Sequence, residues 1–90
     1  MTKTYLSTRS DLPAKASVTL TAAGWSGSTQ TVSVSRMTTD CAVIVSPDVS
    51  SIGVCQQCEI YAQSQGNGTL TFTCSARPTT NVIFHIVMVF

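Results

Sequence analysis

Charged residues are scarce in this chain: 90 residues contain five Lys or Arg and four Asp or Glu, which is 10%. The basic residues are scattered singly, whereas a nucleic-acid-binding surface needs them clustered on one face. No apolar run approaches the roughly 18 consecutive residues of a membrane-spanning helix. We therefore expect neither nucleic acid nor a membrane as a partner.

The beginning of the chain lacks the apolar central run of a secretory signal peptide. Between Thr2 and Arg9, only Tyr5 and Leu6 are apolar. This pattern favours synthesis in a cytosol, with release, if any, by a route other than secretion.

Residues that carry catalytic chemistry are equally sparse. His85 is the only histidine, and no serine lies in the G-x-S-x-G setting of a nucleophile elbow. The four carboxylates fall in predicted turns or at strand ends, and the glycines around Asn67 lack the strand–turn–helix context of a phosphate-binding loop. We predict no catalytic residue, no cofactor and no enzyme activity, and we interpret His85 as a buried or interfacial imidazole with one hydrogen-bond partner.

The four cysteines are Cys41, Cys55, Cys58 and Cys74, and they contain a single C-x-x-C. A structural zinc site needs a second such pair or two histidines, so no metal is predicted. In the predicted strands, Cys41 lies on the same face as Val43 and Val45, and Cys74 on the same face as Leu70 and Phe72. Both cysteines are therefore expected to be small core residues. Free thiols are favoured, and a disulfide and a metal site are the alternatives.

The stretch that organises the chain is its last, residues 81–90. Eight of the nine residues after Asn81 are apolar, β-branched or aromatic types dominate, and Gly and Pro are absent, which indicates a central strand. Side chains alternate between the faces of a strand. One face therefore carries Val82, Phe84, Ile86, Met88 and Phe90, and the other carries Ile83, His85, Val87 and Val89.

The rest of the chain predicts further short strands, each alternating in polarity and bounded by turn residues. They cover residues 16–22, 29–35, 41–46, 60–65 and 69–75, with a tight hairpin turn at Gly66-Asn67-Gly68. A single helical turn, capped by Ser46 or Asp48, fits within residues 47–59. We predict an all-β fold, an antiparallel β-sandwich of Ig-like or jelly-roll-like type with six to seven strands, over residues 14–90, preceded by an arm or edge strand at 1–13.

Two apolar faces on one strand are more than so short a chain is expected to cover by itself. Fully burying a Val, Ile, Phe or Met is worth about 1.5–3 kcal/mol, and a large uncovered patch marks an interaction site. We therefore predict a homo-oligomer, with a trimer as one arrangement, whose interface contains Ile83, His85, Val87 and Val89. The alternative is a glycan-binding module that stacks sugars on Trp25 or Tyr61.

Five segments carry a family resemblance: residues 18–26 (VTLTAAGWS), 30–35 (QTVSVS), 43–47 (VIVSP), 68–74 (GTLTFTC) and 77–84 (RPTTNVIF). The chain from residue 17 to 90 resembles small β-rich virion accessory proteins of phages and prophages of Gram-positive gut bacteria. The resemblance implies a head-decoration, head-fibre or tail-fibre protein that is made in the host cytoplasm and located in the virion. It also implies capsid or tail proteins as partners and, for an adhesin, a host surface glycan.

Overall fold

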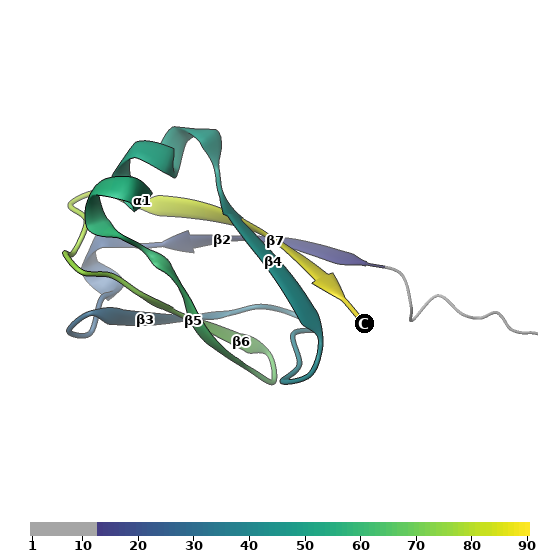
Figure 1. The fold of residues 1–90 in the computed structure, drawn as a ribbon. Coiled ribbons are helices and arrows are strands. Elements are labelled where there is room, and N and C mark those ends of the chain that lie inside the picture. The colour runs from purple at the N-terminus through teal and green to yellow at the C-terminus, as the bar shows by residue number, and fades with distance from the viewer. Residues whose placement is uncertain (1–12) are drawn as a thin grey trace, which may run out of the picture.

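The computed structural model describes residues 13–90 and shows two antiparallel three-stranded sheets packed face to face (Figure 1). In the first sheet, β7 (Val82–Val89) lies between β2 (Ala14–Leu20) and β4 (Ala42–Pro47). In the second, β6 (Thr69–Thr73) lies between β3 (Thr29–Ser33) and β5 (Tyr61–Gly66). The predicted antiparallel sandwich is confirmed, with six strands in the described residues. The arm predicted at residues 1–13 lies outside them, except for Pro13.

The segment between β4 and β5 is more helical than predicted. A 3-10 turn, η3 (Val49–Ser51), runs directly into α1 (Ile52–Cys58), where a single turn was expected. The predicted cap at Asp48 is confirmed, because its carboxylate accepts a hydrogen bond from the Ser50 amide. Cys55 and Cys58 therefore both lie on α1, shortly before β5.

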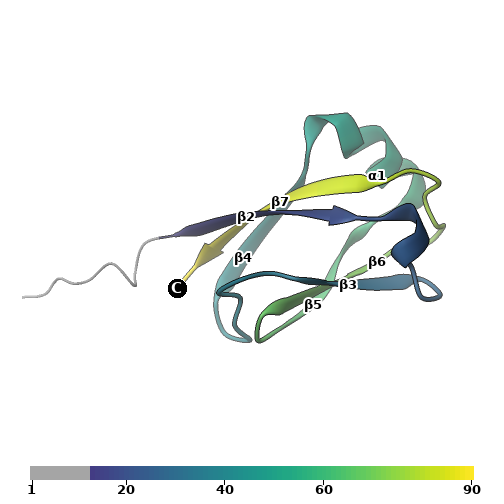
Figure 2. The same ribbon diagram turned by 180° about the vertical axis from the view of Figure 1, so that it is seen from behind.

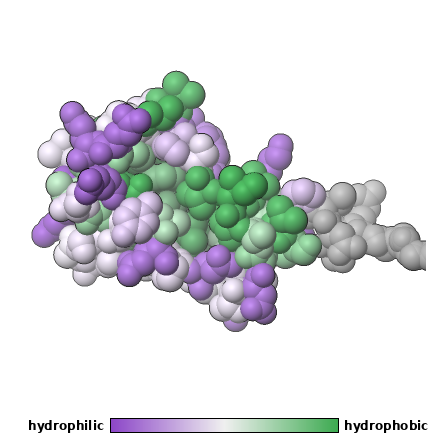
Figure 3. Space-filling model, viewed as in Figure 1, coloured by the Kyte–Doolittle hydropathy of each residue, from purple (hydrophilic) through white to green (hydrophobic). Residues whose placement is uncertain are grey.

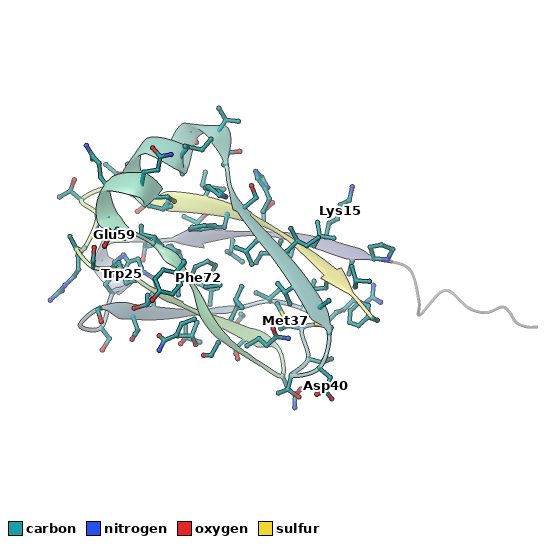
Figure 4. All side chains as sticks on the ribbon, in the orientation of Figure 1. Lys15, Trp25, Met37, Asp40, Glu59 and Phe72 are labelled. Carbon is teal, nitrogen blue, oxygen red and sulfur yellow. The ribbon has the colours of Figure 1, made fainter. Side chains whose placement is uncertain are left out.

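The centre of the core is a contact between the two sheets. Phe72 of β6 and Phe84 of β7 are both buried, and their ring centroids lie 4.7 Å apart with the planes tilted by 36°. This separation is within the range of favourable aromatic pairs. Figure 4 labels Phe72 between the two layers.

β7 alternates as predicted. Val82, Phe84, Ile86 and Met88 are buried, and the residues between them are half-buried or exposed. Phe90 departs from the prediction: it follows the last strand residue, is 41% exposed and has the Arg36 guanidinium 5.0 Å from its ring centroid. The period of two is lost at Phe90 because β7 and its pairing with β4 both end at Val89.

One end of the sandwich is closed by Trp25 and Gln30. Trp25 is only 6% exposed and belongs to the core. The buried Gln30 amide accepts from the Thr21 amide at 3.1 Å and donates to the Thr21 carbonyl at 3.0 Å. Gln30 thus pairs with the backbone as a neighbouring strand does and joins β3 to the end of β2, on the side seen in Figure 2.

The β5–β6 hairpin contains an irregularity and the predicted turn. Register shifts between Ala62 and Ser64, so that Gln63 bulges from the ladder. Gly68 has a φ of 79°, a left-handed conformation that glycine adopts without strain. The Gly66-Asn67-Gly68 hairpin is therefore confirmed.

β7 extends beyond β4, and η3 continues its hydrogen bonding. The last pair of the two strands joins Pro47 to Phe84. The Asp48 amide then donates to the Ile83 carbonyl at 2.8 Å, and the Ile83 amide donates to the buried Ser51 hydroxyl at 2.9 Å. Ser51 thus acts as the acceptor that a longer β4 would otherwise supply.

Replacing Ser51 with Ala removes this acceptor. Because an unsatisfied buried amide costs about 1–3 kcal/mol, we expect the Ser51→Ala variant to lose about that much free energy of unfolding, measured by urea denaturation. Ser35→Ala, at an exposed position, is the control and is expected to change stability little. Equal stability of both variants would contradict the role given to Ser51.

Candidate functional site

The most distinctive surface of the described chain is the side of the β2–β7–β4 sheet that faces away from the core, which we call the outer face. The strand register aligns its side chains in rows, with Ser17 and Ser46 flanking His85 and with Lys15 and Ile44 flanking Val87. All four predicted interface residues lie on this face. Its full set is Lys15, Ser17, Thr19, Ala42, Ile44, Ser46, Ile83, His85, Val87 and Val89.

One part of the outer face is polar. The Ser17 hydroxyl lies 3.0 Å from Nδ1 of His85, and Nε2 of the same ring lies 2.7 Å from Oδ1 of Asp48. The other carboxylate oxygen, Oδ2, accepts from the Ser50 hydroxyl at 2.6 Å and from the Ser50 amide at 3.0 Å. Two strands, β2 and β7, and the capped η3 turn thus contribute to one chain of hydroxyl, imidazole and carboxylate.

The state of Asp48 fixes the proton positions along this chain. Hydrogen bonds from the Ser50 hydroxyl, from His85 and from the Ser50 amide lower the pKa of Asp48 from 3.8 to about 2. An ionised carboxylate only accepts hydrogen bonds, so Nε2 of His85 carries the proton that it shares with Asp48. In the neutral ring, Nδ1 is then the acceptor for the Ser17 hydroxyl.

This order of groups is that of acyl-transfer sites, in which a carboxylate orients an imidazole that accepts a proton from a hydroxyl. In such sites Nε2 faces the hydroxyl and Nδ1 faces the carboxylate. In this protein Nδ1 faces the hydroxyl and Nε2 faces the carboxylate. His85 is not buried within one chain, because its side chain is 51% exposed, and it has two hydrogen-bond partners where one was predicted. Sequence analysis missed Ser17 and Asp48, because only the register of β2 on β7 and the end of β4 bring them to His85.

The other part of the outer face is apolar. Ile44 is 61% exposed, Val89 is 40% exposed, and Val87 is half-buried beside Ile44. Figure 3 shows hydrophobic surface gathered over β4 and the end of β7. We call Ile44, Val87 and Val89 the apolar patch. Phe90 is not part of it, because it follows β7 and lies beside Arg36.

The two aromatic residues predicted to stack on sugars are in different situations. Trp25 cannot serve as such a platform, because its ring is buried at the end of the sandwich (Figure 4). Trp25 is a large apolar side chain, and it lies at the end of the sandwich where Gln30 joins β3 to the end of β2. Tyr61 is 61% exposed but belongs to β5 in the second sheet. The proposed pair of aromatics therefore reduces to Tyr61.

All four cysteines are free thiols in the structure, and the predicted core positions of Cys41 and Cys74 are confirmed by their burial. Burial raises the pKa of the Cys55 and Cys74 thiols, with a smaller contribution from neighbouring Cys58. Within residues 13–90, His, Cys, Asp and Glu side chains form no group of three or more that could hold a metal ion.

Comparison of the chain with models of protein families, with curated proteins and with solved structures finds no match in any of the three. Among the described residues, no helix has the length and apolar character needed to cross a bilayer. The function of the outer face is therefore inferred from the arrangement of its own side chains.

The low pKa of Asp48 predicts a specific acid sensitivity. A carboxylate whose pKa is lower in the folded state than in the unfolded chain stabilises the fold above the unfolded value, and this stabilisation is lost as pH falls through the folded value. Here the window runs from about 3.8 down to about 2. We expect the Asp48→Asn variant to have a lower free energy of unfolding than the wild type at neutral pH. As the pH is lowered through this window, the difference between the two free energies, measured by urea denaturation, should become smaller.

The matched control is Asp40→Asn, which removes an exposed carboxylate at the opposite end of β4. Ser50→Ala should reproduce part of the Asp48 effect, because the Ser50 hydroxyl contributes most to the lowered pKa. A stability difference between wild type and Asp48→Asn that stays constant from pH 7 to 2 would contradict this account.

Proposed function

We propose that the protein is a structural subunit that self-associates through the apolar patch and serves as a virion accessory protein of a phage. The observation that carries the first part is the exposure of Ile44 and Val89 beside Val87 on one side of one sheet. Contiguous apolar surface of this kind on a soluble protein marks an interaction site.

The composition of the outer face favours a second copy as the occupant of the patch. Lys15, His85 and Asp48 are its charged or titratable groups, and they lie on β2, in the middle of β7 and beyond the end of β4. Lys15 is the cross-strand neighbour of Val87 in the patch. Its long side chain can keep the ammonium group in water at the edge of a contact between two copies, which avoids burying an unpaired charge. A closed symmetric contact of this kind uses the same surface on each subunit.

Burial of the patch would also supply free energy for association. Each of its side chains still exposes apolar area whose burial is worth about 25 cal/mol per Å². Polar side chains next to the patch, such as Ser46 and Ser17, can form the rim that such interfaces carry. Both dimer and trimer satisfy these constraints, and the measured mass distinguishes them.

The virion role is supported by the resemblance of residues 17–90 to phage accessory proteins and by a low-charge, hydroxyl-rich β-sandwich that suits close packing of many copies. In this proposal the subunits attach to capsid or tail proteins. The glycan-binding alternative is less favoured, because Trp25 is buried and Tyr61 alone remains as an exposed aromatic ring on the second sheet.

Self-association through the patch is tested by Ile44→Asp. A carboxylate at this position would have to be buried without a partner, so we expect association to weaken by about 100-fold or more. Sedimentation or light scattering over a range of concentrations should give multiples of the 9.5 kDa chain for the wild type and 9.5 kDa for the variant.

The matched control is Tyr61→Asp, which introduces the same charge at a position of equal exposure on the other sheet. It should associate as the wild type does, and circular dichroism should show that both variants are folded. A wild type that remains at the mass of one chain at every concentration would refute self-association, and a weaker association of Tyr61→Asp alone would move the interface to the other sheet.

A further inference from the structure

We propose that Ser17 is a nucleophile, activated by His85 and Asp48, that takes the acyl group of short-chain carboxylate esters. This activity goes beyond the structural role proposed above. It rests on the polar part of the outer face, and the two proposed surfaces share only Val87.

The first support is the linear order of the three groups. The Ser17 hydroxyl to Nδ1 distance of 3.0 Å and the Nε2 to Asp48 distance of 2.7 Å both lie within the reach expected of a nucleophile, its base and the group that orients the base. Because Asp48 holds the proton on Nε2, the lone pair of the neutral ring is on Nδ1. Nδ1 faces the Ser17 hydroxyl, which must lose its proton in the reaction.

The second support is the rigidity of the orienting group. The Asp48 carboxylate is held by two hydrogen bonds from Ser50, and its backbone amide is held by the Ile83 carbonyl at 2.8 Å. His85 lies in the middle of the central strand of its sheet, with a hydrogen-bonded neighbour on each side. Both the base and its partner are therefore positioned by regular structure, which a catalytic constellation requires.

The third support is access. Ser17 is exposed, and a shallow open hollow of about 480 Å³ lies over it, lined by Lys15, Ala16, Ser17, His85, Ile86 and Val87. Val87 gives this hollow an apolar wall that suits a short acyl chain. Lys15 also lines the hollow and points away from the core (Figure 4), so it supplies a positive charge near the site where the acyl group would bind.

The proposed reaction has two steps. In the first, the Ser17 oxygen bonds to the acyl carbon as its proton passes to Nδ1 of His85; the bond from that carbon to the leaving alcohol then breaks, and the alcohol takes the proton. In the second, water gives a proton to Nδ1 and attacks the acyl carbon, and the Ser17 oxygen recovers the proton as the carboxylic acid leaves. Asp48 stays ionised throughout, and the net change is hydrolysis of one ester.

The test uses the full chain and p-nitrophenyl acetate, with nitrophenol release followed by absorbance and the acetylated residue located by mass spectrometry. We expect acetyl-Ser17 in the wild type. Since a positioned base contributes about 10²–10⁴-fold, His85→Ala should lower the rate of Ser17 acetylation by about 100-fold or more, and Asp48→Asn should lower it by less.

The matched control is Ser46, which flanks His85 from β4 as Ser17 does from β2. Ser46→Ala should leave acetylation at Ser17 unchanged, and Ser46 itself should remain unlabelled. Absence of label at Ser17, equal label at both serines, or an unchanged rate in a folded His85→Ala variant would overturn the proposal. Repeating the measurement in Ile44→Asp separates the two proposals, since acylation does not require self-association.

Discussion

The register of β7 between β2 and β4 is the constraint on which this molecule depends. Because side chains alternate along a strand, the same eight residues place four side chains in the core and present the others to the outside. A slip of one residue would exchange these sets, exposing Phe84 and burying His85. The contact of Phe84 with Phe72 across the sandwich gives the observed register a large energetic advantage.

The same register brings separated residues together on the outer face. Ser17 and His85 are 68 residues apart in sequence, and His85 and Asp48 are 37 apart, yet each pair is hydrogen-bonded. Asp48 reaches the ring because β4 ends at Pro47 and the chain turns there into η3. The apolar patch lies further along β7, where Ile44 and Val89 have no such polar neighbours, so one sheet carries two surfaces of different character.

Local pattern was sufficient to predict the sandwich, the alternation of Val82 to Met88, the Gly66-Asn67-Gly68 turn and the Asp48 cap. Each of these features depends on residues close in sequence. The exposure of Phe90 was missed because alternation continues only as far as the strand does. Ser17 and Asp48 were missed as partners of His85 because cross-strand register depends on the whole core, and the alternation of a single strand does not specify its neighbour's alignment.

The bulge at Gln63 has a consequence for how this protein can polymerise. Among the described residues, β2, β3, β4 and β5 all lie at sheet edges, and an open edge is a template for fibril growth by strand addition. The bulge twists β5 out of the flat geometry that such addition needs, and Pro47 removes a backbone donor from the end of β4. Strand addition at the edges formed by β4 and β5 is thereby disfavoured.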